Sequence, residues 1–298
     1  MPTKPLESVL YRELSKAEAK SVIEVASPLL REIVNYGTNA FMRCATSTPG
    51  EVNEDVALLT LYLHIIEMTD GIEILVSESC PAPAIPLVRS SWEALISMEY
   101  ILEADYLRRS LAWLANYART RLDGYRSLDS STIQGKEFLE ALAADRWVRV
   151  DVLAPSNTDM EELLKGIANL EKFLARPQFQ TVEEEYVRTK KKRKSRPQWF
   201  QLFDGPTSIR GLARHLNRHA QYDFLYRSWS SVVHAQDASR LINRRLRDAN
   251  SNKQITSFAT SLFLSATQML LKKFRPGEDL SVWYKDEVRE RFLLIGKP

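Results

Sequence analysis

Cysteine and glycine are scarce in this sequence of 298 residues. Two cysteines, Cys44 and Cys80, are too few for a disulfide framework or a metal–thiolate cluster, and we expect both to be reduced and mostly buried. Only 10 glycines, alongside many Leu, Ala, Glu, Arg and Ile residues, favour helices over sheets. No run reaches about 18 consecutive apolar residues, and the first residues lack the apolar segment of a signal peptide. We therefore expect a cytoplasmic protein without a membrane span.

The common catalytic and cofactor motifs are missing as well. The sequence contains no GxGxxG, GxxxxGK[ST], GxSxG, HExxH or CxxC pattern. His215 and His219 are four residues apart, a spacing that can bind a metal from one helix face. They lie in a basic segment without a carboxylate close in sequence, so a surface role or a phosphate contact is the better interpretation. We expect neither a metal site nor a cofactor.

The sequence predicts an all-α protein, a multi-helix bundle of about eight to ten helices with no sheet. Apolar residues recur at helical spacing in most segments. We divide the chain into an N-terminal helical segment, 1–50, and a main helical domain, 51–298, or treat both as one continuous domain. Pro81, Pro83 and Pro86 are expected to break the chain between two helices. The predicted helices include residues 54–79, 87–103, 105–128, 134–148, 159–174, 254–273 and 280–294.

Positive charge is concentrated in one part of the chain. The net charge is only +3, yet residues 176–247 contain 16 Lys and Arg against 6 Asp and Glu. Seven of the ten residues from Val187 to Arg196 are basic, which predicts a basic loop at 187–198. This loop is either solvated without function or a phosphate-binding segment for RNA or another polyanion. In the second case the binding residues are Lys190, Lys191, Lys192, Arg193, Lys194 and Arg196.

A predicted helix over residues 221–237 carries four polar side chains on one face. With 100° per residue and Tyr226 at 0°, Ser230 falls at about 40°, His234 at about 80° and Arg227 at about 100°. A phenol, a hydroxyl, an imidazole and a guanidinium facing one way can form a site. They can equally form a hydrogen-bonded cluster inside a helical core.

An earlier helix carries Arg89 and Glu93, four residues apart and therefore one turn apart on the same face. Their position beside the apolar stripe that includes Val88 and Trp92 leaves two interpretations open. One is a surface ion pair, and the other is a partly buried pair that lines or braces a site. His64, among leucines and isoleucines, is interpreted as a core histidine rather than a ligand.

Three stretches together resemble a known family: PLVRSSWEALISMEYIL at 86–102, WFQLFDGPTSIRGLARHL at 199–216 and YDFLYRSWSSVVHA at 222–235. The pattern is an Arg-x-x-x-Glu helix, an aromatic stretch with Ile-Arg before a short helix, and a Tyr-Arg-x-x-Ser-x-x-x-His helix. It resembles a widespread, mostly bacterial family of helical proteins catalogued as a domain of unknown function. The resemblance covers roughly residues 75–237 and implies no established activity.

The spacing of Arg227 and His234, with six residues between them, also resembles the Arg-x(4–6)-His pattern of the HEPN superfamily. Many HEPN proteins are metal-independent ribonucleases of bacterial defence and toxin systems, and they usually work as dimers. By this resemblance Arg227 binds the scissile phosphate and His234 transfers protons, while Tyr226 and Ser230 orient the substrate. Ser228 follows Arg227, where the superfamily more often has Asn, Asp or His.

Two functions remain open from the sequence. In the first, the protein is an endoribonuclease, a homodimer in the manner of HEPN proteins, with Arg227 and His234 as its catalytic residues. In the second, it is a non-catalytic helical regulatory or interaction module, and Glu93, Tyr226, Ser230 and His234 form a buried polar network that fixes helix packing. A pocket for a small ligand between helices is a further alternative.

Overall fold

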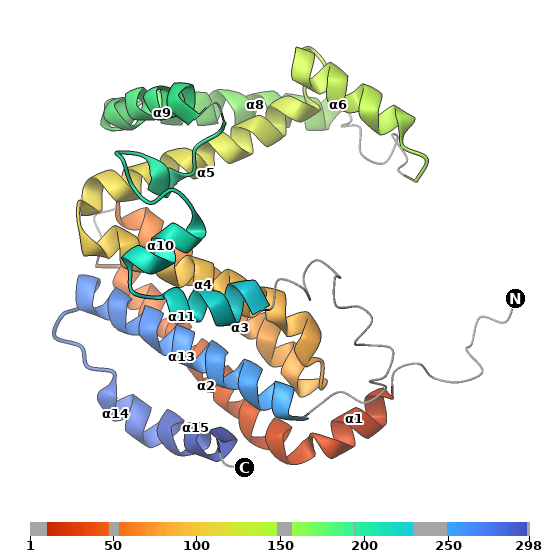
Figure 1. Ribbon diagram of the computed structural model, residues 1–298, viewed down its shortest axis with the longest axis vertical. Coiled ribbons are helices and arrows are strands. Elements are labelled where there is room, and N and C mark those ends of the chain that lie inside the picture. Colours follow the sequence, from red (N-terminus) through yellow and green to blue (C-terminus); the bar gives the residue numbers. More distant parts are fainter. Residues whose placement is uncertain (1–10, 48–53, 148–156, 194, 229–248, 297–298) are drawn as a thin grey trace, which may run out of the picture. The chain divides into compact units, whose positions relative to one another are not determined.

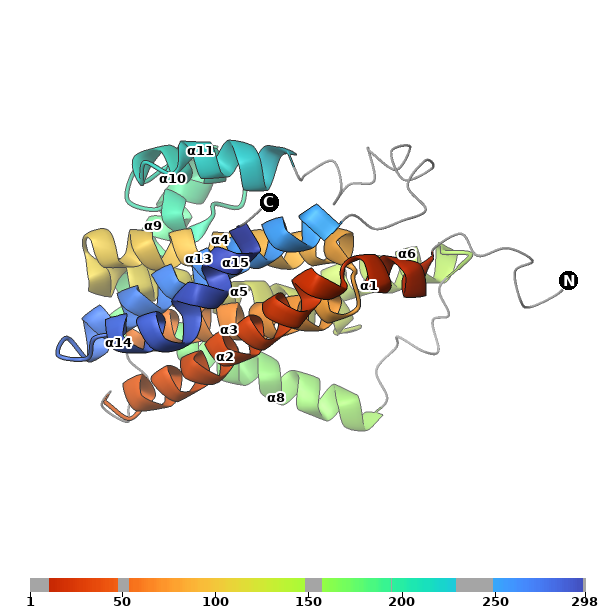
Figure 2. The ribbon, with the colours of Figure 1, turned by 90° about the horizontal axis from the view of Figure 1, so that it is seen from below.

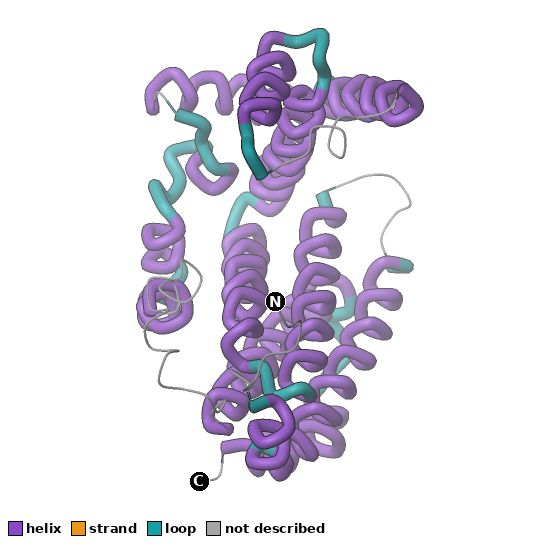
Figure 3. Tube along the Cα trace, turned by 90° about the vertical axis from the view of Figure 1, so that its right-hand side faces the viewer, coloured by secondary structure: helices purple, strands orange, loops and turns teal. Residues whose placement is uncertain are grey.

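The computed structural model describes residues 11–47, 54–147, 157–193, 195–228 and 249–296. Every regular element within these ranges is a helix, which confirms the all-α prediction, and the helices are somewhat more numerous than the eight to ten predicted (Figure 3). None of the described helices combines the length and the apolar character that a membrane span requires.

The chain forms two compact units, and the division predicted near residue 50 stays a prediction. Unit 1 contains residues 1–104 and 209–298, and unit 2 is the intervening segment, residues 105–208. Unit 1 is therefore built from two stretches of sequence separated by unit 2.

Unit 1 is organised around four long helices that lie side by side, α2, α3, α4 and α13 (Figures 1 and 2). Their shared core contains Leu29, Tyr62, Trp92 and Phe263, each fully buried. Tyr62 Oη is 2.8 Å from Thr267 Oγ1, so the buried phenol has a polar partner. The helices of unit 1 are α1 (Arg12–Glu18), α2 (Lys20–Ala45), α3 (Asp55–Ser77), α4 (Pro81–Glu103), α10 (Ile209–His215), α11 (His219–Gln221), the π-helical η3 (Tyr222–Ser228), α13 (Ala249–Phe274), α14 (Ser281–Trp283), the π-helical η5 (Tyr284–Val288) and α15 (Arg289–Gly296).

The three prolines near residue 80 do not interrupt the chain as predicted. Helix α4 begins at Pro81 and continues through Pro83 and Pro86 to Glu103. The first turn of a helix leaves its N–H groups without helical partners, so Pro81 and Pro83 remove no hydrogen bond there. Only Pro86 lies far enough inside to remove one. The prolines therefore mark the start of this helix and not a gap before it.

Unit 2 is organised around helix α5, which contacts the other helices of the unit. The face of α5 that includes Leu111, Leu114, Ala118 and Leu122 is buried. The chain enters α5 through Asp105, which has the left-handed φ of 49°. The helices of unit 2 are α5 (Tyr106–Leu128), α6 (Ile133–Ala144), α8 (Asn157–Leu174), η1 (Pro177–Phe179), α9 (Gln180–Arg193) and η2 (Trp199–Gln201).

The basic loop predicted at 187–198 is wrong for its first half, because α9 continues to Arg193. Val182, Tyr186 and Thr189 are buried at helical spacing just before the charge run and anchor the helix on its apolar side. Lys190, Lys191, Lys192 and Arg193 then occupy its last turn, where cations interact favourably with the helix dipole. The charge run is therefore the C-terminal turn of a helix.

Candidate functional site

The predicted Arg89–Glu93 pair is formed within helix α4. Arg89 Nε donates to Glu93 Oε1 at 3.1 Å, and the Arg89 side chain is only 15% exposed, whereas that of Glu93 is 44% exposed. The guanidinium is thus partly buried while its carboxylate partner reaches solvent. Arg89 Nη1 is buried and has no hydrogen-bond partner among the described residues. Both N–H donors of this nitrogen are therefore unpaired within the described part of the protein.

Aromatic rings from η3 pack against this part of α4. Arg89 Cζ lies 3.6 Å from the centroid of the Tyr226 ring, a cation–π contact. Tyr226 stacks on Tyr222 with centroids 5.1 Å apart and ring planes 15° apart. Both rings face Trp92, at centroid distances of 6.1 Å and 6.3 Å. Arg89, Glu93 and Tyr226, which the sequence singles out in two distant stretches, therefore lie in one cluster.

Sequence reasoning missed the polar anchor of this cluster. Trp92 Nε1 donates to Gln221 Oε1 at 3.1 Å, which ties α4 to the residue immediately before η3. Trp92 was predicted only as part of an apolar stripe, and Tyr222 was not singled out. The four-residue spacing of Tyr222 and Tyr226 is the sequence signal for their contact, since residues so spaced share a helix face.

The helix predicted from residue 221 is present in the part that the structure describes, but its hydrogen bonding differs from the prediction. Residues 222–228 form a π-helix, in which each hydrogen bond spans one residue more than in an α-helix. The 100° rotation used to place Tyr226 and Arg227 on a common face does not hold here. Such π-helical turns are rare in proteins as a whole, and those that do occur often lie at functional sites.

Arg227 is exposed and makes no hydrogen bond or ion pair with another described residue. Within the described residues no carboxylate neutralises this guanidinium, whose five N–H donors suit it to an anionic ligand. Ser230 and His234, the other two members of the predicted polar face, lie outside the described residues. The approach of Arg227 to His234 stays a prediction.

The predicted phosphate-binding residues are found in unit 2, and they differ in availability. Lys190, Lys191 and Lys192 are exposed, and Lys192 Nζ is 3.7 Å from Asp204. Arg193 is half-buried. Arg196 pairs with Asp123 and donates to Thr120 Oγ1 at 2.9 Å, so its charge is already compensated. Lys194 is outside the described residues.

Two of the three histidines predicted to be non-ligands, His64 and His215, each have a polar side-chain partner. His64 Nε2 is 2.7 Å from Ser90 Oγ in the bundle of unit 1. His215 Nε2 is 2.8 Å from Glu103 Oε2, so a carboxylate that is distant in sequence reaches it in space. Among the residues described, no group of three or more His, Cys, Asp or Glu side chains is arranged to hold a metal ion.

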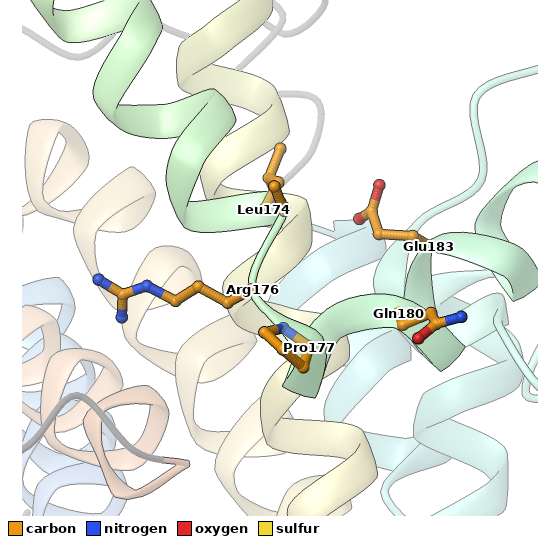
Figure 4. A pocket seen from close by; sticks show the side chains of 6 residues that line it. Leu174, Arg176, Pro177, Gln180 and Glu183 are labelled. Carbon is orange, nitrogen blue, oxygen red and sulfur yellow. The ribbon is translucent and has the colours of Figure 1, made fainter.

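Each unit also contains an open cleft. In unit 1 a cleft of about 580 Å³ is lined by charged residues of both signs, including Glu103, His215 and Lys272, around Met269. In unit 2 a cleft of about 450 Å³ lies where the chain turns from α8 into α9 (Figure 4). Glu183 and Gln180 line that cleft, while Arg176 points away from both of them.

Glu183, beside the unit 2 cleft, is a carboxylate with only one oxygen in use. It pairs with Arg119 through Oε2, and its Oε1 is buried without a hydrogen bond to any described residue. Burial raises the pKa of this carboxyl, and the Arg119 charge opposes that rise. Arg119 also lies over the Tyr186 ring, with Cζ 3.6 Å from the centroid. Burial therefore outweighs the attraction of Arg119 in this ion pair between α5 and α9, and the charge of Glu183 is only partly compensated.

Comparison with known proteins gives one match. The model of a family described as a family of unknown function, DUF5677, matches residues 55–254, which is about two thirds of the chain. No curated protein matches the sequence, and no solved structure matches it.

Proposed function

The chain belongs to the DUF5677 family of unknown function, and from that premise we propose that it is a metal-independent endoribonuclease of the HEPN type. The observation that carries the proposal is Arg227, an exposed guanidinium on a π-helical turn with no carboxylate partner among the described residues. Phosphate is the group that such a planar, permanently charged fork binds best.

The reaction needs two groups from this chain. Arg227 binds the non-bridging oxygens of the scissile phosphate and stabilises the charge that builds on them. His234 accepts the proton of the ribose 2′-hydroxyl, because an imidazole titrates near neutral pH. The 2′-oxygen then bonds to phosphorus and the bond to the 5′-oxygen breaks. The imidazolium of His234 returns its proton to the 5′-oxygen, so the products are a 2′,3′-cyclic phosphate and a 5′-hydroxyl end.

The cluster around Arg89 supports this proposal by positioning η3. The Arg89 guanidinium holds the Tyr226 ring on one side, and Trp92 fixes the start of the turn through Gln221. Arg227 directly follows Tyr226, so its backbone is held at a defined place. The exposed lysines of the last turn of α9 add sequence-independent affinity for RNA. We place the enzyme in the cytoplasm of a bacterium, as a homodimer in a defence or toxin setting.

Cleavage of a labelled RNA by the purified full chain, in buffer with EDTA, tests the proposal. We expect the wild-type chain to cleave, and Arg227→Ala and His234→Ala each to lose at least about 100-fold in rate. Arg214→Ala and His219→Ala, exposed residues of the same types on nearby helices, are the matched controls and should cleave normally. An RNA with a single 2′-deoxyribose at the cleaved position lacks the attacking hydroxyl, so neither the wild-type protein nor any of these variants should cleave it.

Two results would count against the ribonuclease proposal. Wild-type protein that leaves RNA intact under these conditions, and that causes no RNA fragmentation when its synthesis is induced in bacteria, would contradict ribonuclease activity. Cleavage that persists in both folded variants would move the catalytic site elsewhere. Circular dichroism establishes that each variant is folded.

A second candidate function rests on the same cluster. The contacts of Tyr226 with Arg89 and with Trp92 favour a non-catalytic module in which Glu93, Tyr226, Ser230 and His234 stabilise helix packing. In that case Ser230→Ala and His234→Ala lower the free energy of unfolding by about 1–3 kcal/mol. In a catalytic site the same changes leave stability within about 0.5 kcal/mol of wild type. Urea unfolding of the two variants separates the candidates.

A further inference from the structure

One face of α5 in unit 2 carries an aromatic and cationic stripe, defined by Trp113, Tyr117, Arg121 and Tyr125. These residues recur every four positions, so their side chains follow one another along the helix over about 18 Å. The rings of Trp113 and Tyr117 are nearly parallel, 8° apart, with centroids 5.9 Å apart. Arg121 Cζ lies 5.9 Å from the Tyr117 ring and 5.5 Å from the Tyr125 ring.

The α5 stripe is largely separate from the hydrophobic core. Tyr117 is 44% exposed and Arg121 is exposed, while Trp113 and Tyr125 are half-buried. The buried face of α5 is made by other residues of the helix, such as Leu114 and Leu122. A row of aromatic rings that stays partly exposed to water is a common feature of binding surfaces.

Arg121 is held in place without being neutralised. Its Nη1 donates to Tyr117 Oη at 3.0 Å and its Nη2 donates to Tyr125 Oη at 2.7 Å. These hydrogen bonds from the guanidinium raise the pKa of Arg121 further above its ordinary value. Within the described part of the chain it has no carboxylate partner, unlike Arg119 and Arg126 of the same helix, which pair with Glu183 and Glu171. A fixed, uncompensated guanidinium is suited to an anion.

A glycine in α8 fixes one end of the stripe. A Cβ at Gly166 would lie 2.7 Å from Tyr125 Cε2, so the backbone of α8 packs directly on that ring. The Tyr125 hydroxyl therefore has a defined position, and it in turn orients Arg121. The arrangement is pre-organised by packing and does not depend on an exposed side chain finding its own conformation.

We infer that the α5 stripe binds single-stranded nucleic acid, with bases stacking on Trp113 and Tyr117 and a phosphate bound by Arg121. Rows of aromatic rings interleaved with cations are what single-stranded nucleic acids bind, since every base has a face that stacks. An acidic peptide would satisfy Arg121 but would leave the rings without planar partners. The inference deepens the proposed function by assigning RNA binding to a surface on α5, and it depends on that proposal only for the choice of RNA over DNA.

Fluorescence anisotropy with the full chain and a labelled 2′-O-methyl RNA of roughly 10 nucleotides tests the inference. The probe cannot be cleaved by 2′-hydroxyl attack, so binding is measured apart from catalysis. We expect Trp113→Ala and Tyr117→Ala to weaken binding roughly 5- to 150-fold each. Tyr117→Phe should retain most of the affinity, because it keeps the ring. Arg121→Ala should also reduce the slope of log affinity against log salt by about 0.7.

Matched controls come from the same unit. Trp147, 93% exposed, and Arg146, also exposed, follow α6 in the chain and are not part of the stripe, so Trp147→Ala and Arg146→Ala should bind as wild type does. A DNA strand of the same sequence shows whether the surface discriminates between the sugars. A duplex of the same sequence should bind more weakly, because its bases are not free to stack on the rings.

The results that overturn the inference are distinct from those that overturn ribonuclease activity. Wild-type protein that does not bind any single strand, or stripe variants that bind as tightly as wild type, would refute the stripe as a binding surface even if Arg227 and His234 proved catalytic. Stripe variants that change the sedimentation of the protein instead of its affinity would identify an interface between copies and would equally refute it. Loss of binding in the stripe variants, with RNA left intact by the wild type, would retain the inference and reject the nuclease.

Discussion

At the residue scale, Glu185 shows how a charge in the middle of a helix can organise its surroundings. This buried carboxylate on α9 accepts two hydrogen bonds from Arg188, at 2.6 Å and 2.9 Å. It also accepts one from Thr189 Oγ1 and one from the backbone N–H of Phe203, both at 2.8 Å. Phe203 and the next residue have left-handed φ values of 57° and 56°, so Glu185 holds a strained turn in place.

The stability of the protein should therefore depend on the charge of Glu185. Hydrogen bonding from Arg188, against the opposing effect of burial and with help from Phe203 and Thr189, lowers the pKa of Glu185 from 4.5 to about 2. A carboxyl whose pKa is lower in the folded state than in the unfolded state stabilises the folded protein. This contribution is complete at pH values above the unfolded-state pKa. This stabilisation is lost as the pH falls from 4.5 towards 2.

We predict that Glu185→Gln lowers the free energy of unfolding by about 3 kcal/mol at pH 6. The difference from wild type should shrink below pH 4.5 and nearly vanish by pH 2, as urea unfolding at a series of pH values would show. Glu184→Gln is the matched control, because Glu184 is exposed and bonded only to Gln180 among the described residues. A difference that stays constant across the pH range would mean that shape, and not charge, is what Glu185 contributes.

At the element scale, the long helices of unit 1 approach closely at one glycine. Gly37 of α2 faces α13, and a Cβ at this position would overlap the Phe263 ring and lie 3.0 Å from Tyr62 Oη. Phe263 and Tyr62 are fully buried, so neither ring can move into solvent. By contrast, Gly124 in α5 has open space around its Cα.

Alanine at these two glycines should have opposite effects. Alanine favours a helix over glycine by about 1 kcal/mol, but overpacking a filled core costs about 1–3 kcal/mol or more. We predict that Gly37→Ala destabilises the protein by about 1–2 kcal/mol, while Gly124→Ala stabilises it by up to about 1 kcal/mol. Thermal unfolding measures both, and a stabilised Gly37→Ala would show that α2 and α13 do not pack as closely as described.

The elements that the sequence predicts well are those with local signals. Long apolar stripes define α3, α5 and α8 to within a few residues, and the four-residue spacing of Arg89 and Glu93 gives their ion pair. The charge run at the end of α9 predicts a loop when it is considered alone, but the buried anchors Val182 and Tyr186 that precede it extend the helix to Arg193. Prolines usually predict a break, but in the first turn of α4 they are compatible with the helix, which therefore begins earlier than predicted.

The candidate site was less predictable because its parts come from distant segments. Nothing in the spacing within α4 places Tyr226 over Arg89, since this contact depends on how η3 packs against α4. The π-helical turn has no local sequence signal of the kind that caps and prolines provide. The bond from Trp92 to Gln221 could not be foreseen for the same reason.

At the scale of the whole molecule, unit 1 is one core made from two ends of the sequence. Helix α13 packs on α2, α3 and α4, which lie before unit 2 in the chain. Removing the Phe263 side chain leaves a cavity in this shared core, and such truncations cost about 3–5 kcal/mol. Every helix that lines the cavity should therefore lose stability.

We therefore predict that Phe263→Ala accelerates amide hydrogen exchange in α2 and α3 as well as in α13. The buried ring contacts Tyr62 of α3, with centroids 5.8 Å apart, and closes over Gly37 of α2. Leu293→Ala, which alters an exposed side chain of α15, is the control and should leave exchange in these helices unchanged. Acceleration confined to α13 would show that the four helices do not open as one cooperative unit.

The division of unit 1 by unit 2 has a consequence for a chain that is still being synthesised. As the protein leaves the ribosome, α2, α3 and α4 emerge first, and the helix that completes their core, α13, begins only at Ala249. At usual rates of elongation the intervening residues take roughly 7–30 s to add. Unit 2 has emerged in full by then, while the apolar surface that α13 will cover is still exposed on the nascent chain. A pause in translation before Ala249 thus prolongs the state in which this protein is most open to chaperones, proteases and aggregation.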